Sequence, residues 1–476
     1  MTFNSIEFML FYPIVFAIYW VLPHKFRWFV LLISSYYFYM SWSPRYVVLI
    51  LFTTIISYVA ALLLEKTQVD AMKKYILIGT LMACLGVLFF FKYFNFIGES
   101  ITDILSMFSI DMHPMTVSLL LPVGISFYTF QTLSYVIDVY RGDTEAEHHF
   151  GIYAVFISFF PQLVAGPIER TNNLLPQMKS EKTFDYNMAI YGARQMLWGF
   201  FKKLAVADVV AVYVDNAYAD LASCTGFDLC MAIFLFTVQI YCDFSGYSDI
   251  AIGTAKLLGV NLVKNFSSPY FAVSVKEFWS RWHISLSAWF RDYVYIPLGG
   301  NRCSKTRHYL NLLITFLISG LWHGANWTFV AWGGVHGIAQ ILEDAIGLDK
   351  PKKNKIGKLI SWSIVFIFCN LAWVLFRADN FRDALYVMCH VFVDLTDFSS
   401  YLHTNIGLTM SRLLYIVIVI LVILIYDFLS LKKDVLSEFD SRSLVIRLIV
   451  EYGIVICIGY ALYNSTGLNQ FVYFQF

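Results

Sequence analysis

Two histidines interrupt a strongly apolar chain, and each lies in a cluster of tryptophan and polar residues. His283 ends the segment 277–283, and His323 follows the apolar run 310–321 directly after Trp322. A neutral imidazole can take a proton from a hydroxyl or a thiol near pH 7, which is the work of a general base. An ionisable group at membrane depth is costly, so it indicates a functional site. We therefore predict His323 as the catalytic centre; the alternative is a buried histidine bonded to a backbone carbonyl.

The residues around the two histidines supply further candidates. His283 either orients a substrate or lies at the headgroup boundary with its neighbouring tryptophans, and the sequence favours neither interpretation. Asn326 lies three residues after His323, so the two share a face if this stretch is helical. The Asn326 amide, or a backbone amide, could stabilise the oxyanion that forms during acyl transfer. Trp322 is a candidate substrate contact at the same place.

Two charged residues are also candidate substrate-binding groups. Arg281 could hold the phosphates of a cofactor by bidentate hydrogen bonds, or it could pair with Glu277, an interpretation at least as well supported. Asp243 could line a cavity, or it could cap a helix that begins near Ser245, and the sequence favours capping.

Other kinds of site find no support in the sequence. The histidines at 283, 323 and 336 form no i, i+4 pair and no HExxH motif, so we predict no metal site. A GxSxG nucleophile elbow is also absent from the sequence. The eight cysteines include no CxxC pair, and we interpret them as apolar packing residues rather than disulfides or metal ligands.

The amino-acid composition indicates which kind of secondary structure positions these side chains. Of the 476 residues, 59% are hydrophobic and only 14% are charged, whereas a soluble domain carries about 25% charged residues. The sequence therefore predicts an all-α polytopic membrane protein embedded in a lipid bilayer. The net charge of +1 argues against a nucleic-acid partner, which would require concentrated positive charge.

Apolar runs of bilayer-spanning length predict about ten to twelve crossings, with some further segments re-entrant or interfacial. The candidate spans lie at about 6–22, 28–43, 46–64, 75–95, 116–140, 150–165, 189–213, 227–242, 308–322, 326–345, 357–376, 410–430 and 445–464. Basic loops at 65–74, 350–358 and 432–447 predict the cytoplasmic side, and the aspartate-rich segment 377–409 predicts the outer side. Both termini then lie outside.

In combination, these segments resemble the membrane-bound O-acyltransferases, and within them the bacterial branch that acts in alginate O-acetylation. The resemblance covers nearly the whole chain and is carried by the motifs at 161–168, 243–249, 278–283, 291–293 and 322–324, together with 3–8 and 23–27. No single motif would be enough.

This resemblance implies properties that composition cannot show. The fold would be a ring of transmembrane helices around a central funnel or tunnel, forming one domain over 1–476 with N-terminal helices at 1–140, a catalytic core at 141–345 and C-terminal helices at 346–476. His323 would be the essential catalytic residue and His283 the second. Acetyl-CoA would arrive from the cytoplasm, and the acceptor, a cell-surface polysaccharide, would be met outside with the help of an esterase-like extracytoplasmic partner. The location would be the bacterial cytoplasmic membrane.

Three other functions remain open at this point. Related proteins transfer D-alanine to teichoic acid from a carrier protein, and this activity fits the same motifs. A transporter of a polar lipid-linked substrate would also carry charges within the membrane, although no repeated halves are visible in the sequence. A scaffold for an envelope assembly would tolerate substitution of His283 and His323.

Overall fold

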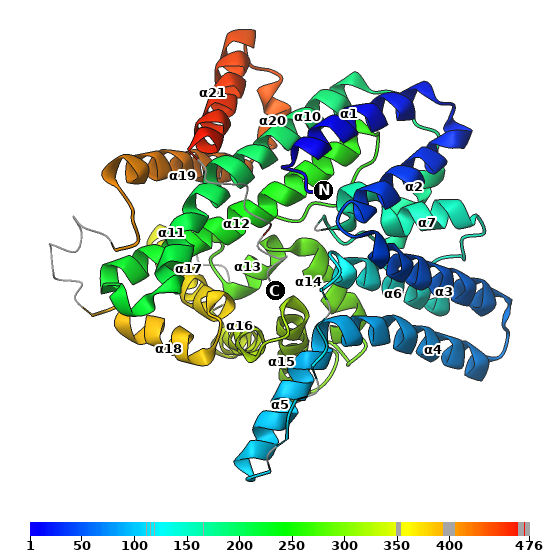
Figure 1. Ribbon diagram of the computed structural model, residues 1–476, viewed down its shortest axis with the longest axis horizontal. Coiled ribbons are helices and arrows are strands. Elements are labelled where there is room, and N and C mark those ends of the chain that lie inside the picture. Colours follow the sequence, from blue (N-terminus) through cyan, green and yellow to red (C-terminus); the bar gives the residue numbers. More distant parts are fainter. Residues whose placement is uncertain are drawn as a thin grey trace. The chain divides into compact units, whose positions relative to one another are not determined.

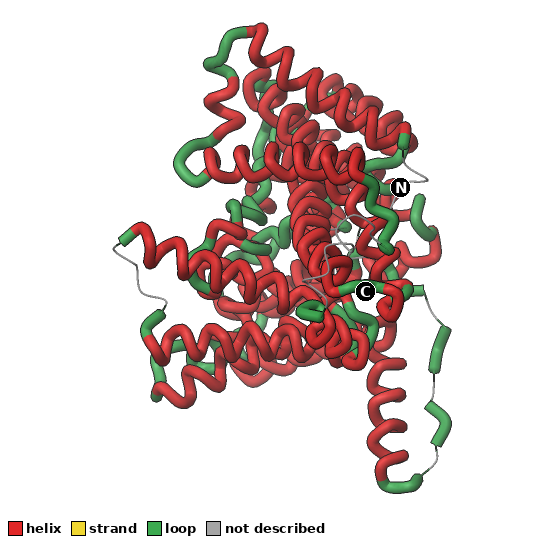
Figure 2. Tube along the Cα trace, turned by 90° about the vertical axis from the view of Figure 1, so that its left-hand side faces the viewer, coloured by secondary structure: helices red, strands yellow, loops and turns green. Residues whose placement is uncertain are grey.

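The computed structural model describes residues 1–110, 112–114, 116–118, 120–164, 166–348, 354–393, 405–464 and 471. Within these ranges every regular element is a helix, as Figure 2 shows. An all-helical fold suits a chain embedded in lipid, because each helix satisfies its backbone hydrogen bonds within its own segment. The basic loop 350–358, the outer segment 377–409 and the motif 161–168 each include residues outside the described ranges.

The chain forms two compact units. The first contains residues 1–193 and 251–263, and the second contains 194–250 and 264–476. The division of a single domain into parts at 1–140, 141–345 and 346–476 remains a prediction.

Several helices of the first unit match predicted spans, whereas the helices Phe94–Met107 and Thr171–Lys179 correspond to none. The helices of this unit are α1 (Ile6–Val21), α2 (His24–Met40), α3 (Val47–Lys66), α4 (Asp70–Leu88), α5 (Phe94–Met107), α6 (Ile125–Arg141), α7 (Phe150–Ser158), α8 (Phe160–Leu163), α9 (Thr171–Lys179) and the start of α10 (Tyr186–Phe200) (Figure 1). The span predicted at 116–140 begins later, because Gly124, with φ of +75°, precedes the first turn of α6.

The second unit holds the rest of α10, most of the helix Gly226–Leu257, the other remaining helices and every candidate site residue. After a π-helical segment at Phe201–Ala207 come α11 (Asp208–Ala219), α12 (Gly226–Leu257), α13 (Val275–Arg281), α14 (Ile284–Phe290), α15 (Lys305–His323), α16 (Trp327–Ile346), α17 (Lys355–Arg377), α18 (Phe381–His390), α19 (Met410–Ser430), α20 (Val435–Phe439) and α21 (Leu444–Tyr463) (Figure 1). The most apolar window of α12 is 72% buried, against 6% for α21, so α12 is a core helix and α21 is peripheral.

One prediction about α12 is wrong. The sequence placed a span at 227–242 and a new helix start near Ser245, whereas α12 runs without a break from Gly226 to Leu257. Asp243 therefore lies inside a helix and caps nothing. Gly259, which has φ of +75°, follows just after the end of α12.

Six described helical segments are long and apolar enough to cross a membrane, and the shorter apolar segments 6–21 and 150–163 add to them. The six are Pro44–Lys66, Asp70–Met107, Gly226–Leu257, Lys355–Arg377, Met410–Ser430 and Leu444–Tyr463. The chain is thus a polytopic helical membrane protein, as its composition predicted. The count of ten to twelve crossings and the ring around a tunnel remain predictions.

The helices α15 and α16 form a tight antiparallel pair that carries His323 at its turn. Their backbones approach at two glycines: a Cβ added at Gly320 would lie 2.3 Å from the Phe329 carbonyl oxygen, and one at Gly333 would lie 2.2 Å from the Phe316 carbonyl oxygen. Small residues of this kind allow close helix packing within membranes.

We expect Gly333→Ala to destabilise this helix pair, because neither backbone can yield to the added methyl group. Overpacking of this kind costs about 1–3 kcal/mol. The matched control is Gly334→Ala, whose Cβ would meet only the flexible Leu317 side chain, at 3.3 Å. Thermal unfolding in detergent would show a lower midpoint for Gly333→Ala alone; equal midpoints for the two variants would contradict the close approach.

Candidate active site

His283 lies at a sharp turn between α13 and α14. Its φ of +44° and ψ of +53° place it in the left-handed region, which is uncommon for a residue other than glycine. Such a conformation persists only where its surroundings hold it, and it is frequent at functional sites. The turn separates the two short helices and buries the imidazole completely.

The surroundings of His283 are a polar side chain and several rings. Its Nδ1 lies 3.1 Å from Oδ1 of Asn265, and the rings of Phe244 and Phe266 lie 4.6 and 6.4 Å from its own centroid. Burial lowers the pKa of the His283 imidazole to about 3. The ring is therefore neutral at physiological pH.

His323 is the last residue of α15 and is only 3% exposed. Rings surround it, with centroids at 5.0 Å for Trp322, 5.0 Å for Trp332 and 5.5 Å for Phe376. The His283 and His323 centroids are 6.4 Å apart. The structure thus brings together two histidines that stand forty positions apart in the sequence.

Asn326 does not share a helix with His323, contrary to the sequence-based expectation. The helix α15 ends at His323, and Asn326 is the N-cap of α16. Its Oδ1 accepts a hydrogen bond from the Thr328 backbone at 3.0 Å, and its Nδ2 donates to the Asp379 carbonyl at 2.8 Å. Trp322 is buried and lies beside both histidines, 6.1 Å from the His283 ring.

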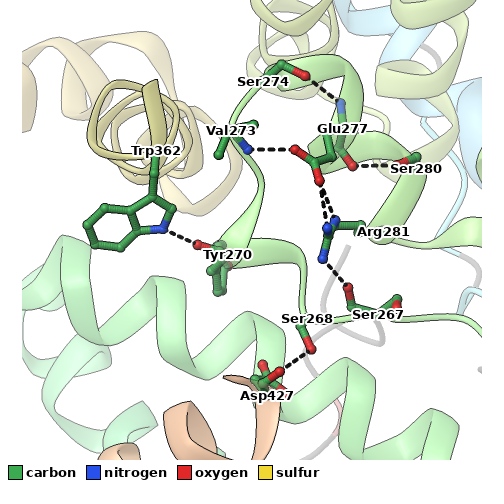
Figure 3. Close-up of polar contacts among 10 residues, drawn as sticks. All are labelled: Ser267, Ser268, Tyr270, Val273, Ser274, Glu277, Ser280, Arg281, Trp362 and Asp427. Atoms are coloured by element: carbon green, nitrogen blue, oxygen red, sulfur yellow. Dashed lines mark hydrogen bonds and ion pairs between the residues drawn. The ribbon is translucent and has the colours of Figure 1, made fainter. Parts of the chain in front are cut away.

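Arg281 forms an ion pair with Glu277, the interpretation that the sequence left open beside phosphate binding (Figure 3). Its Nη2 and Nε donate to Glu277 Oε1 at 2.6 and 3.1 Å, and Nη1 donates to the Ser267 carbonyl at 3.4 Å. Glu277 Oε2 accepts a hydrogen bond from the Val273 backbone in turn. These contacts tie α13 to the loop before it; contact of Arg281 with a substrate remains a prediction.

Asp243 belongs to a buried ionic network that the sequence analysis missed. It forms an ion pair with Lys203 at 2.6 Å, and Lys203 also pairs with Asp208 at 2.8 Å. The adjacent Lys202 pairs with Asp249 at 2.5 Å and donates to Ser245 at 2.9 Å. A signal for this network was present, because two lysines within the apolar span 189–213 must find partners if they are buried.

A cavity of about 430 Å³ lies in the second unit, and neither histidine is among the residues that line it. Polar residues that line it include Lys276, Arg291, His308 and Asp344, and its apolar lining includes Trp279, Leu286, Phe290, Leu312 and Phe316. Ser319 and Ser287 also line it. Ser319 precedes His323 by one turn of α15 and so lies on the same side of that helix. Ser287 is four residues after His283, which is the N-cap of α14. Two lining residues of the cavity are therefore close in sequence to the histidines.

Comparison with known proteins assigns the family. The model of the membrane-bound O-acyltransferase family matches residues 147–349, a segment that contains every candidate site residue. The probable alginate O-acetylase AlgI of Pseudomonas aeruginosa is 40% identical over 387 residues, which are 81% of this chain and 73% of the relative.

Two further relatives carry other names. The peptidoglycan O-acetyltransferase of Helicobacter pylori is 35% identical over 413 residues, which cover 79% of this chain and 77% of the relative. The teichoic acid D-alanyltransferase of Streptococcus thermophilus is 32% identical over 253 residues, or 50% of this chain and 61% of its own. Long matches at this level make this chain, with its pair of buried histidines, a member of the membrane-bound O-acyltransferase family.

Proposed function

We propose that this O-acyltransferase moves an acetyl group from acetyl-CoA in the cytoplasm to hydroxyl groups of a cell-surface polysaccharide outside the bacterial cytoplasmic membrane. The observation that carries the proposal is the pairing of His283 and His323 beside a cavity, in a chain 40% identical to a probable alginate O-acetylase. The acceptor class is supported by two sets of relatives, whose names specify alginate and peptidoglycan.

The proposed reaction is a direct acyl transfer assisted by a neutral imidazole. His323 takes the proton of the acceptor hydroxyl as its oxygen attacks the thioester carbonyl carbon. The carbon–sulfur bond then breaks, and the imidazolium returns the proton to the departing thiolate, so no proton is gained or lost. His283 holds the acceptor or the thioester, and Asn326 or a backbone amide stabilises the oxyanion, an effect worth about 3–4 kcal/mol for one donor. A covalent acyl-histidine would use the same groups.

The cavity is proposed as the site of the acyl thioester. It joins a polar region at Lys276, Arg291 and His308, suited to the phosphates of the donor, to apolar walls suited to its pantetheine arm. The helix α16, which contributes Asp344, ends at Ile346, shortly before the basic loop 350–358 that predicts the cytoplasmic side. The donor therefore arrives from the cytoplasm, and an esterase-like extracytoplasmic partner assists with the polysaccharide.

Ser319→Phe tests this use of the cavity, because a ring at this position would fill the space one turn before His323. We expect the KM for acetyl-CoA to rise by about tenfold or turnover to be lost, since a substrate misplaced by 1 Å can cost a hundredfold. Ser319→Ala is the matched control and should behave as wild type. Unchanged kinetics in Ser319→Phe would remove the cavity from the donor path.

Purified protein in liposomes would test the function itself. With radiolabelled acetyl-CoA on the cytoplasmic face and polysaccharide on the other, we expect label in the polymer and release of free CoA thiol. Transfer from a D-alanyl carrier protein alone would instead support the activity named for the Streptococcus thermophilus relative. A transporter or a scaffold would leave acetyl-CoA intact.

A further inference from the structure

Asn265 is a buried residue that no motif in the sequence singled out. It lies in the loop between α12 and α13 and is 1% exposed. We propose that Asn265 is a positioning residue, which holds His283 as the tautomer protonated on Nδ1 and so makes Nε2 the basic atom of this second imidazole. The inference rests on the proposed function only for the catalytic use of that atom.

The hydrogen-bond partners of Asn265 fix the orientation of its side-chain amide. Its oxygen and nitrogen look alike in shape, so their assignment must come from the hydrogen-bond network. The atom assigned as Oδ1 faces the Ser285 backbone N–H at 3.3 Å and the Ser285 hydroxyl at 2.9 Å. A backbone N–H can only donate, so the atom opposite it must be the oxygen. The amide nitrogen then donates to the Ser248 hydroxyl of α12, at 3.2 Å.

The Asn265 oxygen determines which ring nitrogen of His283 carries the proton. The same Asn265 oxygen lies 3.1 Å from Nδ1 of His283. An amide oxygen accepts only, so Nδ1 must be the nitrogen that carries hydrogen; the opposite tautomer would set two lone pairs against each other. Because the buried ring is neutral, its remaining nitrogen, Nε2, holds the lone pair.

Asn265 also supports the backbone turn that carries the His283 ring. The Ile284 backbone N–H donates to the Asn265 carbonyl oxygen at 2.9 Å, and the Ser285 N–H reaches the side chain of the same residue. One asparagine therefore holds both the imidazole and the left-handed backbone of His283. Hydrogen bonds of this kind are what a conformation with positive φ requires in order to persist.

The described rings that pack on His283 belong to Phe244, Phe266, Trp322 and His323. Of these described rings, that of His323 alone can titrate. Two carboxylates of α12, Asp243 and Asp249, form ion pairs with Lys203 and Lys202. The amide of Asn265 thus sets the tautomer, just as a second group fixes the ring of a catalytic histidine in acyl-transfer enzymes.

A double-mutant cycle tests whether Asn265 acts through His283. We expect Asn265→Ala to lower kcat by about tenfold to a hundredfold, within the range that general acid–base catalysis supplies, with little change in the KM for acetyl-CoA. In a His283→Ala background the same change should have no further effect, because the ring it positions is gone. A full additional loss in that background would overturn the proposal.

A matched control separates positioning from stability. Asn370 in α17 is also buried, and its side chain accepts a hydrogen bond from Thr237 at 2.8 Å. Asn370→Ala should lower the melting temperature as Asn265→Ala does, yet should keep most of kcat. An equal loss of kcat in the two variants would reduce the role of Asn265 to structure alone.

A spectroscopic measurement is independent of turnover, so it distinguishes failure of this inference from failure of the proposed function. In protein labelled with nitrogen-15 histidine, the His283 signals are identified by their absence in His283→Asn. We expect a protonated Nδ1 and a lone-pair Nε2 in wild type. Asn265→Ala, which removes the accepting oxygen, should lose this preference for a protonated Nδ1. A protonated Nε2 in wild type would overturn the assignment even if acetyl transfer is confirmed.

Discussion

His323→Ala should abolish acetylation of the acceptor while the protein still folds. Removing a general base costs about 10²–10⁴ in rate, and here no other described ring that can titrate packs against His323 except that of His283. His283→Ala should also be strongly impaired, because that ring holds a substrate beside the base. The measurement is single-turnover transfer of labelled acetyl groups from acetyl-CoA to polysaccharide oligomers by purified protein.

Folding must be checked separately in this experiment, because His323 fills space among three aromatic rings. Thermal unfolding in detergent should show a modest loss for His323→Ala, and His323→Asn should restore part of the stability without restoring activity. His390→Ala is the matched control, since the ring of that half-buried histidine of α18 stacks on Tyr386 of its own helix and its Nδ1 lies at hydrogen-bond distance from the Tyr386 carbonyl oxygen. Wild-type turnover in His323→Ala would refute the assignment of the base.

The class of the protein and its candidate histidines emerged from the sequence for different reasons. Composition alone indicates a lipid-embedded helical chain, because few charges remain to face water. The cost of an imidazole in an apolar run singled out His323. Nothing in the spacing of His283 and His323 showed that they meet, since that contact depends on the turn between α13 and α14. Only the resemblance to a family paired them.

The wrong predictions share one physical cause, which is that a polar residue was interpreted without its partner. Asp243 was interpreted as the cap of a helix that begins near Ser245, yet α12 continues through this residue, whose charge Lys203 neutralises. The left-handed conformation of His283 carries no glycine or asparagine signal. Asn265, which supports it, is eighteen residues away and gives no sequence pattern.

The second large prediction concerns stability and follows from the ion pair between Lys203 and Asp243. Lys203 is 3% exposed and Asp243 is 1% exposed, and their ion pair joins the π-helical segment 201–207 to the core helix α12. Removing one partner of a buried pair leaves an uncompensated charge and costs about 3–5 kcal/mol. We therefore expect Lys203→Ala to unfold at a markedly lower temperature and to accumulate poorly in the membrane.

A variant without the buried charges should recover much of this stability. It combines Lys203→Met and Asp243→Leu with Asp208→Asn, because Asp208 is the second partner of Lys203. Replacing all members of a buried ion pair by apolar residues is often neutral or stabilising. The matched control is Lys433→Ala, whose pair with Glu438 is largely exposed and should contribute little. If Lys203→Ala proves no more damaging than Lys433→Ala, the charges are not held in a buried network, and the continuity of α12 through Asp243 needs another explanation.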